Sequence, residues 1–135
     1  MSKQSLLCLD VGEKRIGVAL ADTAVRIAVP FDTITVDGGE LQAIADIVVR
    51  EDTDTIIVGY PRNQQGEATA QSSYVEQFAE QLQDLGPKIV FQDESLTSVM
   101  AEQRLKESGR RYEKGDIDMN AAAIILQDYL EEHFG

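Results

Sequence analysis

The chain has 135 residues, of which 43% are hydrophobic and 27% are charged, so its composition is that of a folded protein with a substantial core. Its 24 acidic and 12 basic residues give a net charge of -12, which counts against a protein that coats nucleic acid by neutralising phosphates. We expect one domain over residues 1–135, because this length suits a single domain and no repeat or linker interrupts the chain.

The sequence favours a cytoplasmic protein without a membrane partner. No apolar run approaches the roughly 20 residues that a membrane-spanning helix needs. The first five residues lead directly into a strand-like run and lack the features of a signal peptide. Cys8 is the single cysteine, so an internal disulfide is impossible and a reducing compartment is the simplest setting.

The first third of the chain predicts three consecutive antiparallel strands, over residues 5–10, 15–22 and 27–36. A tight glycine turn separates the first two, as in a hairpin. Pro30 favours an edge position or a bend for the third strand, because proline lacks the amide hydrogen that a central strand needs.

The rest of the chain alternates helices and strands. Short apolar runs predict two buried strands, over residues 55–59 and 88–92. Apolar residues at helical spacing predict helices over 40–51, 67–85, 96–107 and 117–133, with loops over 60–66 and 109–116. A helix follows each of the last two strands, which favours parallel pairing through right-handed crossovers. The predicted α/β fold has the order βββαβαβαα, a five-stranded mixed sheet with helices on both faces.

Three acidic residues stand at the ends of three predicted elements. Asp10 ends the first strand, Glu94 follows the fifth, and Asp118 opens the last helix. Asp10 shares a strand face with apolar residues, and an ionised carboxylate there requires compensation. Small residues at 121 and 122, on the same helical face as Asp118, would let that helix lie close against the sheet. We therefore predict that the three acids converge at one rim of the sheet.

Converging carboxylates repel one another unless a cation lies between them. Oxygen-only ligation suits a hard ion, so we expect one or two Mg²⁺ or Mn²⁺ ions held by Asp10, Glu94 and Asp118. Two such ions could activate water and stabilise the leaving oxygen of a phosphodiester. Each acid also has an ordinary structural explanation: Asp10 could begin a turn, Glu94 could face a helix dipole, and Asp118 could cap its helix, a role for which Asp116 competes.

The basic residues are unevenly spread. Five of the twelve lie within one short segment, at Arg104, Lys106, Arg110, Arg111 and Lys114. This segment is either a solvated helix end and loop or a patch that contacts phosphates. We expect Arg110, Arg111 and Lys114 to bind nucleic acid, together with Arg15 and Arg62. Arg15 could equally be a strand residue paired with an acid such as Glu13.

Four motifs in order resemble those of the YqgF family, also called RuvX, of RuvC-like nucleases. Residues 10–19 resemble the opening motif, and residues 58–63 with Gly66 resemble the second. Residues 93–98 resemble the acidic box. Asp118, with the alanines at 121–122 and the apolar residues at 124–126, resembles the last motif. The resemblance spans nearly the whole chain. One departure is Ser95, where the family usually has arginine, which puts a phosphate contact at that position in doubt.

The resemblance implies a ribonuclease H-like fold and a metal-dependent nuclease site at Asp10, Glu94 and Asp118. It also implies a role in maturing the 5′ end of pre-16S rRNA during ribosome biogenesis. Structured RNA and ribosomal proteins are then the expected partners, for a monomer or a homodimer. Family members have also been labelled Holliday junction resolvases, so branched DNA is an alternative substrate.

Two further functions stay open at this point. The chain could be a ribosome-assembly factor that keeps the fold without catalysis. It could also be a phosphate-binding module like those of sugar kinases or actin, which share the core and an early Asp-x-Gly turn. Such proteins clamp a nucleotide between two domains, whereas 135 residues supply one, and no second Asp-x-Gly loop is visible.

Overall fold

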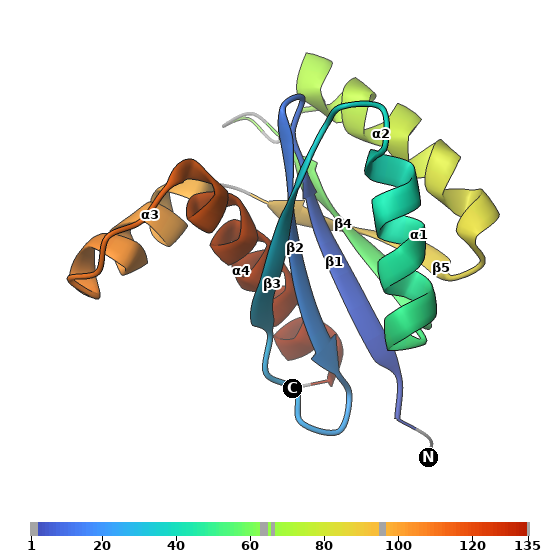
Figure 1. The fold of residues 1–135 in the computed structure, drawn as a ribbon, viewed down its shortest axis with the longest axis horizontal. Helices are drawn as coiled ribbons and strands as arrows, with labels where there is room; N and C mark the ends of the chain where they lie inside the picture. Colours follow the sequence, from blue (N-terminus) through green and yellow to red (C-terminus); the bar gives the residue numbers. More distant parts are fainter. Residues whose placement is uncertain (1–2, 63–64, 66, 95–96, 135) are drawn as a thin grey trace.

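A computed structural model describes residues 3–62, 65, 67–94 and 97–134 of the chain (Figure 1). Within them, one five-stranded sheet is flanked by helices. The elements are β1 (Ser5–Val11), β2 (Arg15–Asp22), β3 (Val29–Thr35), α1 (Glu40–Glu51), β4 (Thr55–Pro61), α2 (Ala70–Leu82), the 3-10 turn η1 (Gln83–Leu85), β5 (Lys88–Glu94), α3 (Thr97–Glu107) and α4 (Lys114–Phe134). No helix in these ranges is both long and apolar enough to span a bilayer.

The sheet has the predicted mixed topology, in the order β3-β2-β1-β4-β5. The β1–β2 and β2–β3 pairs are antiparallel, whereas β1–β4 and β4–β5 are parallel. Strand β3, which contains Pro30, lies at an edge, and its register with β2 shifts between Val18 and Ala19. The expected effect of Pro30 is confirmed in both respects. Since β1, β4 and β5 run the same way, their carboxyl ends lie at one rim.

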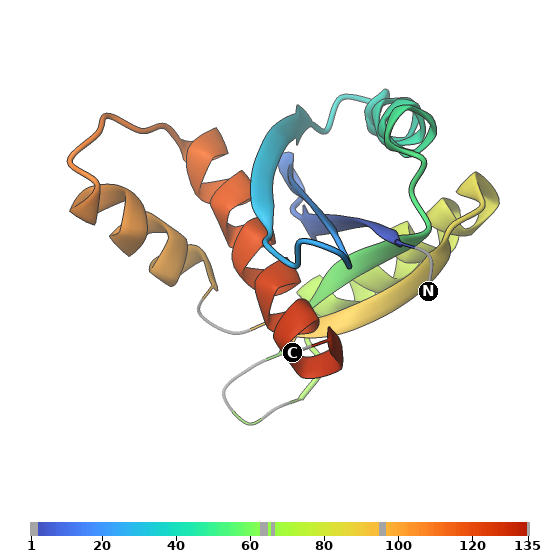
Figure 2. The same cartoon turned by 90° about the horizontal axis from the view of Figure 1, so that it is seen from below.

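Helices cover both faces of the sheet. Leu7 and Leu9 of β1 point into a core with α1 and α2, whereas Leu6 and Cys8 point into a second core with α4. This alternation is the two-residue period of a strand with both faces buried. Figures 1 and 2 show α3 standing off the sheet, beside α4, and its buried Ala101 packs with residues of α4.

Helices α2 and α4 start at other residues than predicted, and α2 ends at Leu82, after which the turn η1 continues to Leu85. Helix α2 begins at Ala70, where Thr69 and Ser72 form a capping box, and not at residue 67. Helix α4 begins at Lys114, so the end of the predicted loop 109–116 is helical. The reason is that the Asp116 carboxylate accepts a hydrogen bond of 2.8 Å from the Glu113 amide, which satisfies a free donor at the helix start. Asp116 therefore caps the start of α4, and Asp118 lies one turn inside the helix.

Helix α4 approaches the sheet closely at Gly17 of β2. A Cβ atom on Gly17 would lie 1.9 Å from the backbone oxygen of Asp118, closer than any real contact. Ala121 and Ala122, one turn further along α4, are completely buried. The expectation that small residues bring this helix against the sheet is confirmed, and it involves a glycine on the strand as well as alanines on the helix.

Replacing Gly17 by alanine is expected to push α4 away and to lower the free energy of unfolding by about 2 kcal/mol or more. Urea denaturation measures this change. Gly115→Ala is the matched control, because its nearest neighbours, atoms of Thr33, lie at ordinary contact distances of 3.5–3.6 Å. A Gly17→Ala protein as stable as the control would contradict the close approach.

Candidate active site

Asp10 lies near the end of β1, directly opposite Gly17 of β2. Opposite residues of an antiparallel pair project from the same face, so the Asp10 side chain points toward α4 beside the hydrogen atoms of Gly17. The backbone of Asp118 occupies the space that a Gly17 side chain would fill. The missing side chain on β2 therefore brings the Asp118 segment next to Asp10.

A second glycine has the same function on the other side of β1. Cys8 pairs with Ile57 of β4, so Gly59, two residues further along, lies on the same face as Asp10. A Cβ atom on Gly59 would lie 2.6 Å from Oε2 of Glu94 and 2.8 Å from Cδ1 of Ile125. The Glu94 carboxyl group thus occupies the space above Gly59, and Asp10 is flanked by glycines that admit the two other acids.

The carboxyl groups of Asp10 and Glu94 interact electrostatically. The pKa of Asp10 is raised to about 6 and that of Glu94 to about 8, and burial is the largest cause in both. The charge of Asp118 contributes to the raised pKa of Asp10, and the charge of Asp10 contributes to that of Glu94. The site therefore disfavours full ionisation of these neighbouring acids. The Oε2 atom of Glu94 is buried and has no hydrogen-bond partner.

The Asp118 carboxylate is held by an arginine. Nε of Arg15 donates to Oδ2 of Asp118 across 2.6 Å, from the first residue of β2 to the first turns of α4. The alternative partner considered for Arg15, Glu13, is not the one observed. No three His, Cys, Asp or Glu residues in the described part of the chain are grouped as metal ligands. The structure thus places the Glu94 carboxyl group beside Asp10, whereas the Asp118 carboxylate is hydrogen-bonded to Arg15.

Arg62 lies just beyond β4, beside the same rim. Its Nε donates to the Asp93 carboxylate at 2.9 Å, and its guanidinium lies over the Tyr60 ring, 4.7 Å from the centroid. The Tyr60 hydroxyl in turn donates to Glu76 at 2.6 Å. Because Asp93 and Glu94 are successive residues of β5, their side chains point to opposite faces, so Arg62 lies at the same rim but on the α2 side of the sheet.

Three of the predicted basic residues lie in the α3–α4 connection and at the first residue of α4. Arg110, Arg111 and Lys114 are exposed, and none of them takes part in an ion pair among the described residues. Lys114 precedes Asp118 by four positions, so the two lie on one side of α4. The basic segment therefore leads toward the acidic residues. Ser95, the position that departs from the family pattern, falls outside the described residues.

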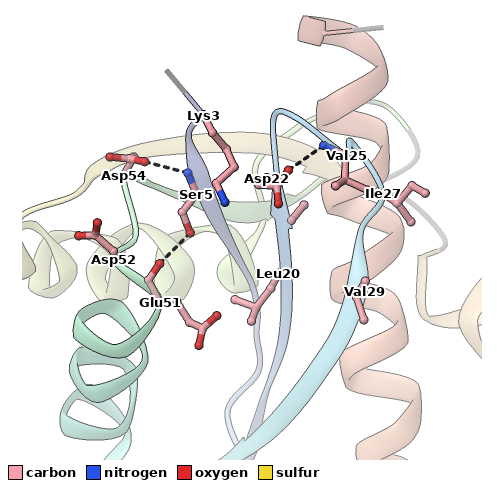
Figure 3. A pocket seen from close by; sticks show the side chains of 11 residues that line it. Lys3, Ser5, Leu20, Asp22, Val25, Ile27, Val29, Glu51, Asp52 and Asp54 are labelled. Atoms are coloured by element: carbon pink, nitrogen blue, oxygen red, sulfur yellow. Dashed lines mark hydrogen bonds between the residues drawn. The ribbon is translucent and has the colours of Figure 1, made fainter. Parts of the chain in front are cut away.

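A groove of about 530 Å³ lies elsewhere (Figure 3). It is lined by the start of β1, including Ser5, by the β2 end at Asp22 and by the residues that precede β4, including Asp54. These positions are at the opposite end of β1 from Asp10. The groove contains none of the predicted site residues, so the chemistry is assigned to the acids and not to the cavity.

Gly17 and Gly59 were missed as site residues. A glycine inside an apolar strand is a signal for close approach of another segment. Both glycines carry that signal, since they lie within the runs 15–20 and 55–60. The identity of the approaching segments, however, follows only from the packing of α4 and the end of β5.

Comparisons with known proteins identify the family of the chain. The family model RuvX, described as Holliday junction resolvase, matches residues 4–132. A protein of Chloroflexus aurantiacus named "Putative pre-16S rRNA nuclease" is 45% identical, covering 97% of this chain and 89% of its own. A protein of the same name from Synechocystis sp. is 39% identical, covering 97% of this chain and 90% of its own.

Solved structures share the fold at low identity. The structure of T. thermophilus RuvC in complex with a Holliday junction substrate has a TM-score of 0.60 at 13% identity, over 98% of this chain and 96% of that one. Fowlpox virus resolvase, in complex with Holliday junction DNA, has a TM-score of 0.58 at 14% identity, over 98% and 100%. The predicted ribonuclease H-like fold is confirmed. Because the family model matches residues 4–132, nearly the whole chain, the chain belongs to the RuvX family.

Proposed function

We propose that this protein is a metal-dependent endonuclease that hydrolyses phosphodiester bonds in the 5′-end processing of pre-16S rRNA. The observation that carries the proposal is the half-buried pair of acids Asp10 and Glu94, which lie at the carboxyl ends of β1 and β5 and have raised pKa values. Two half-buried carboxyl groups whose charges oppose each other are unfavourable for folding alone, so a functional requirement explains them. The names of the relatives supply the substrate.

The acids fit a divalent metal ion. The donors are oxygen atoms, which suits Mg²⁺ or Mn²⁺, and Oε2 of Glu94 is buried without a partner. Asp10 and Glu94 would hold one or two such ions directly, and Asp118 would complete the site once separated from Arg15. When bound, the metal supplies Lewis acidity that polarises a phosphodiester and stabilises its leaving oxygen.

The remaining residues would bind and orient the RNA. Arg110, Arg111 and Lys114 present exposed positive charge on the path to Asp118, and Arg62 donates to Asp93 at the same rim of the sheet. In a chain with a net charge of -12, such local positive charge would select where a polyanion docks. The reduced, buried Cys8 fits the cytoplasmic location that is part of this proposal.

Two alternatives are tested by the same assays. The family description favours a resolvase that cleaves branched DNA, which uses the same acids on another substrate. A ribosome-assembly factor without catalysis would bind precursor RNA, alone or with ribosomal proteins, and leave it intact. Cleavage of RNA and of junction DNA, compared at equal salt, distinguishes the three functions, because binding strength depends steeply on salt.

We expect Asp10→Asn to reduce Mn²⁺-dependent cleavage of 5′-extended 16S rRNA precursor by about a hundredfold or more, because it removes a central ligand. Gel analysis with Mg²⁺ and Mn²⁺ titrated measures this loss. Asp84→Asn is the control, since it makes the same chemical change on the exposed turn η1. Cleavage by the Asp10→Asn protein at the wild-type rate would refute the proposed role of the acids.

We also expect Asp10→Asn to stabilise the metal-free protein at pH 8, by about 1 kcal/mol or a few degrees in Tm. Because Asp10 and Glu94 have raised pKa values in the folded state, the folded protein binds more protons than the unfolded chain between about pH 4 and 8. Their stabilising contribution is therefore present at low pH and is lost as the pH rises. The gain from Asp10→Asn should disappear near pH 5. A gain independent of pH would contradict this account.

Neutralising Arg110, Arg111 and Lys114 together should weaken RNA binding and reduce the slope of log affinity against log salt by about 2, if all three contact phosphates. Fluorescence anisotropy at several salt concentrations measures both effects. The matched control replaces Lys3, Arg50 and Lys88 by glutamine, which removes three charges at the other end of the sheet. Equal losses in the two triple variants would show that only net charge matters.

A further inference from the structure

Arg15 neutralises the acid that the site would need for a metal. It begins β2 and directs its Nε to Oδ2 of Asp118 at 2.6 Å. The Arg15 side chain is 36% exposed and that of Asp118 is 21% exposed, so the pair is partly open to water. Such a pair contributes little to stability compared with a buried one and is easily exchanged.

A metal ion and Arg15 compete for the same group. Oδ2 of Asp118 is already paired with the positive charge of Arg15. A divalent ion bound nearby would repel the Arg15 guanidinium. Asp118 is close enough to Asp10 for its charge to raise the pKa of that residue. A cation held by Asp10 would therefore also attract the Asp118 carboxylate. Binding of the ion thus favours release of Arg15.

A released Arg15 has an obvious new partner. Its guanidinium lies at the rim where the substrate phosphodiester would bind, and the planar fork of arginine donates two parallel hydrogen bonds to a phosphate. The other arginine at the rim, Arg62, donates to Asp93. Arg15 is therefore the arginine whose charge a metal ion would displace.

We propose that Arg15 exchanges ionic partners: it holds Asp118 in the metal-free protein and a substrate phosphate once a divalent cation has bound. In this way metal binding would increase RNA affinity, and RNA binding would increase metal affinity by the same factor. This inference rests on the proposed function, because it requires that the acids bind a cation and that the protein binds RNA.

The test compares wild type, Arg15→Gln and Arg111→Gln. Affinity for a fluorescein-labelled RNA hairpin is measured by anisotropy in EDTA and in Mn²⁺ at constant ionic strength. Gels check that the RNA stays intact, and Ca²⁺ replaces Mn²⁺ if it is cleaved. Affinity for Mn²⁺ alone is measured from the free-ion signal in electron paramagnetic resonance. Circular dichroism checks folding.

We expect Mn²⁺ to increase the RNA affinity of wild type by about five- to tenfold, within the usual range of coupling between sites. Arg15→Gln should match wild type in EDTA, lose this increase, and bind Mn²⁺ several-fold more tightly. Arg111→Gln should weaken RNA binding equally in both conditions, because that residue contacts phosphate without contacting the acids. If Arg15→Gln fails to fold, Arg15→Lys should show the same changes, reduced in size.

Three results would overturn the proposal. An unchanged Mn²⁺ effect in the Arg15→Gln protein would show that Arg15 does not couple the two ligands. Equal weakening of RNA binding in EDTA and in Mn²⁺ would make Arg15 an ordinary phosphate contact. Weaker Mn²⁺ binding would mean that Arg15 orients Asp118 for the metal. Wild type that binds RNA but no Mn²⁺ would instead refute the metal-dependent nuclease itself.

Discussion

The structure depends on keeping a carboxylate, Asp10, on the buried face of a central strand. Desolvation of that charge is unfavourable, and it raises the pKa of Asp10. The pKa of the neighbouring Glu94 is raised as well, so the two acids resist full ionisation together. Arg15 compensates the nearby charge of Asp118.

The glycines at 17 and 59 explain how three chain segments meet around one residue. A side chain at either position would overlap Asp118 or Glu94. The position of helix α4 follows from this arrangement, because its alanines let it lie against the sheet. The first turns of α4 carry both Asp118 and the nearby Lys114. The same helix therefore places an acid of the site and a base of the predicted RNA-binding segment.

Much of the fold could be predicted from sequence because its signals are local. Alternation gave the strands, helical spacing gave the helices, and Pro30 indicated the sheet edge. The errors lay at helix starts, where the side-chain caps of Thr69 and Asp116 decide the boundary. The site could be predicted from the sequence only in part. Strand direction brings Asp10 and Glu94 to one rim, but the Arg15–Asp118 pair depends on how closely α4 packs, which no local pattern encodes.

Helix α3 differs from the other helices in the element that it packs against. It packs on α4, and Ala101 is the α3 residue in the small cluster that joins the two helices among the side chains that the structure describes. Local opening requires little energy where few apolar contacts are lost. The amide hydrogens of α3 should accordingly exchange with solvent sooner than those of α4 or β1. The α3–α4 connection, with its arginines, could then adapt to an irregular nucleic-acid surface while the central strands keep their geometry.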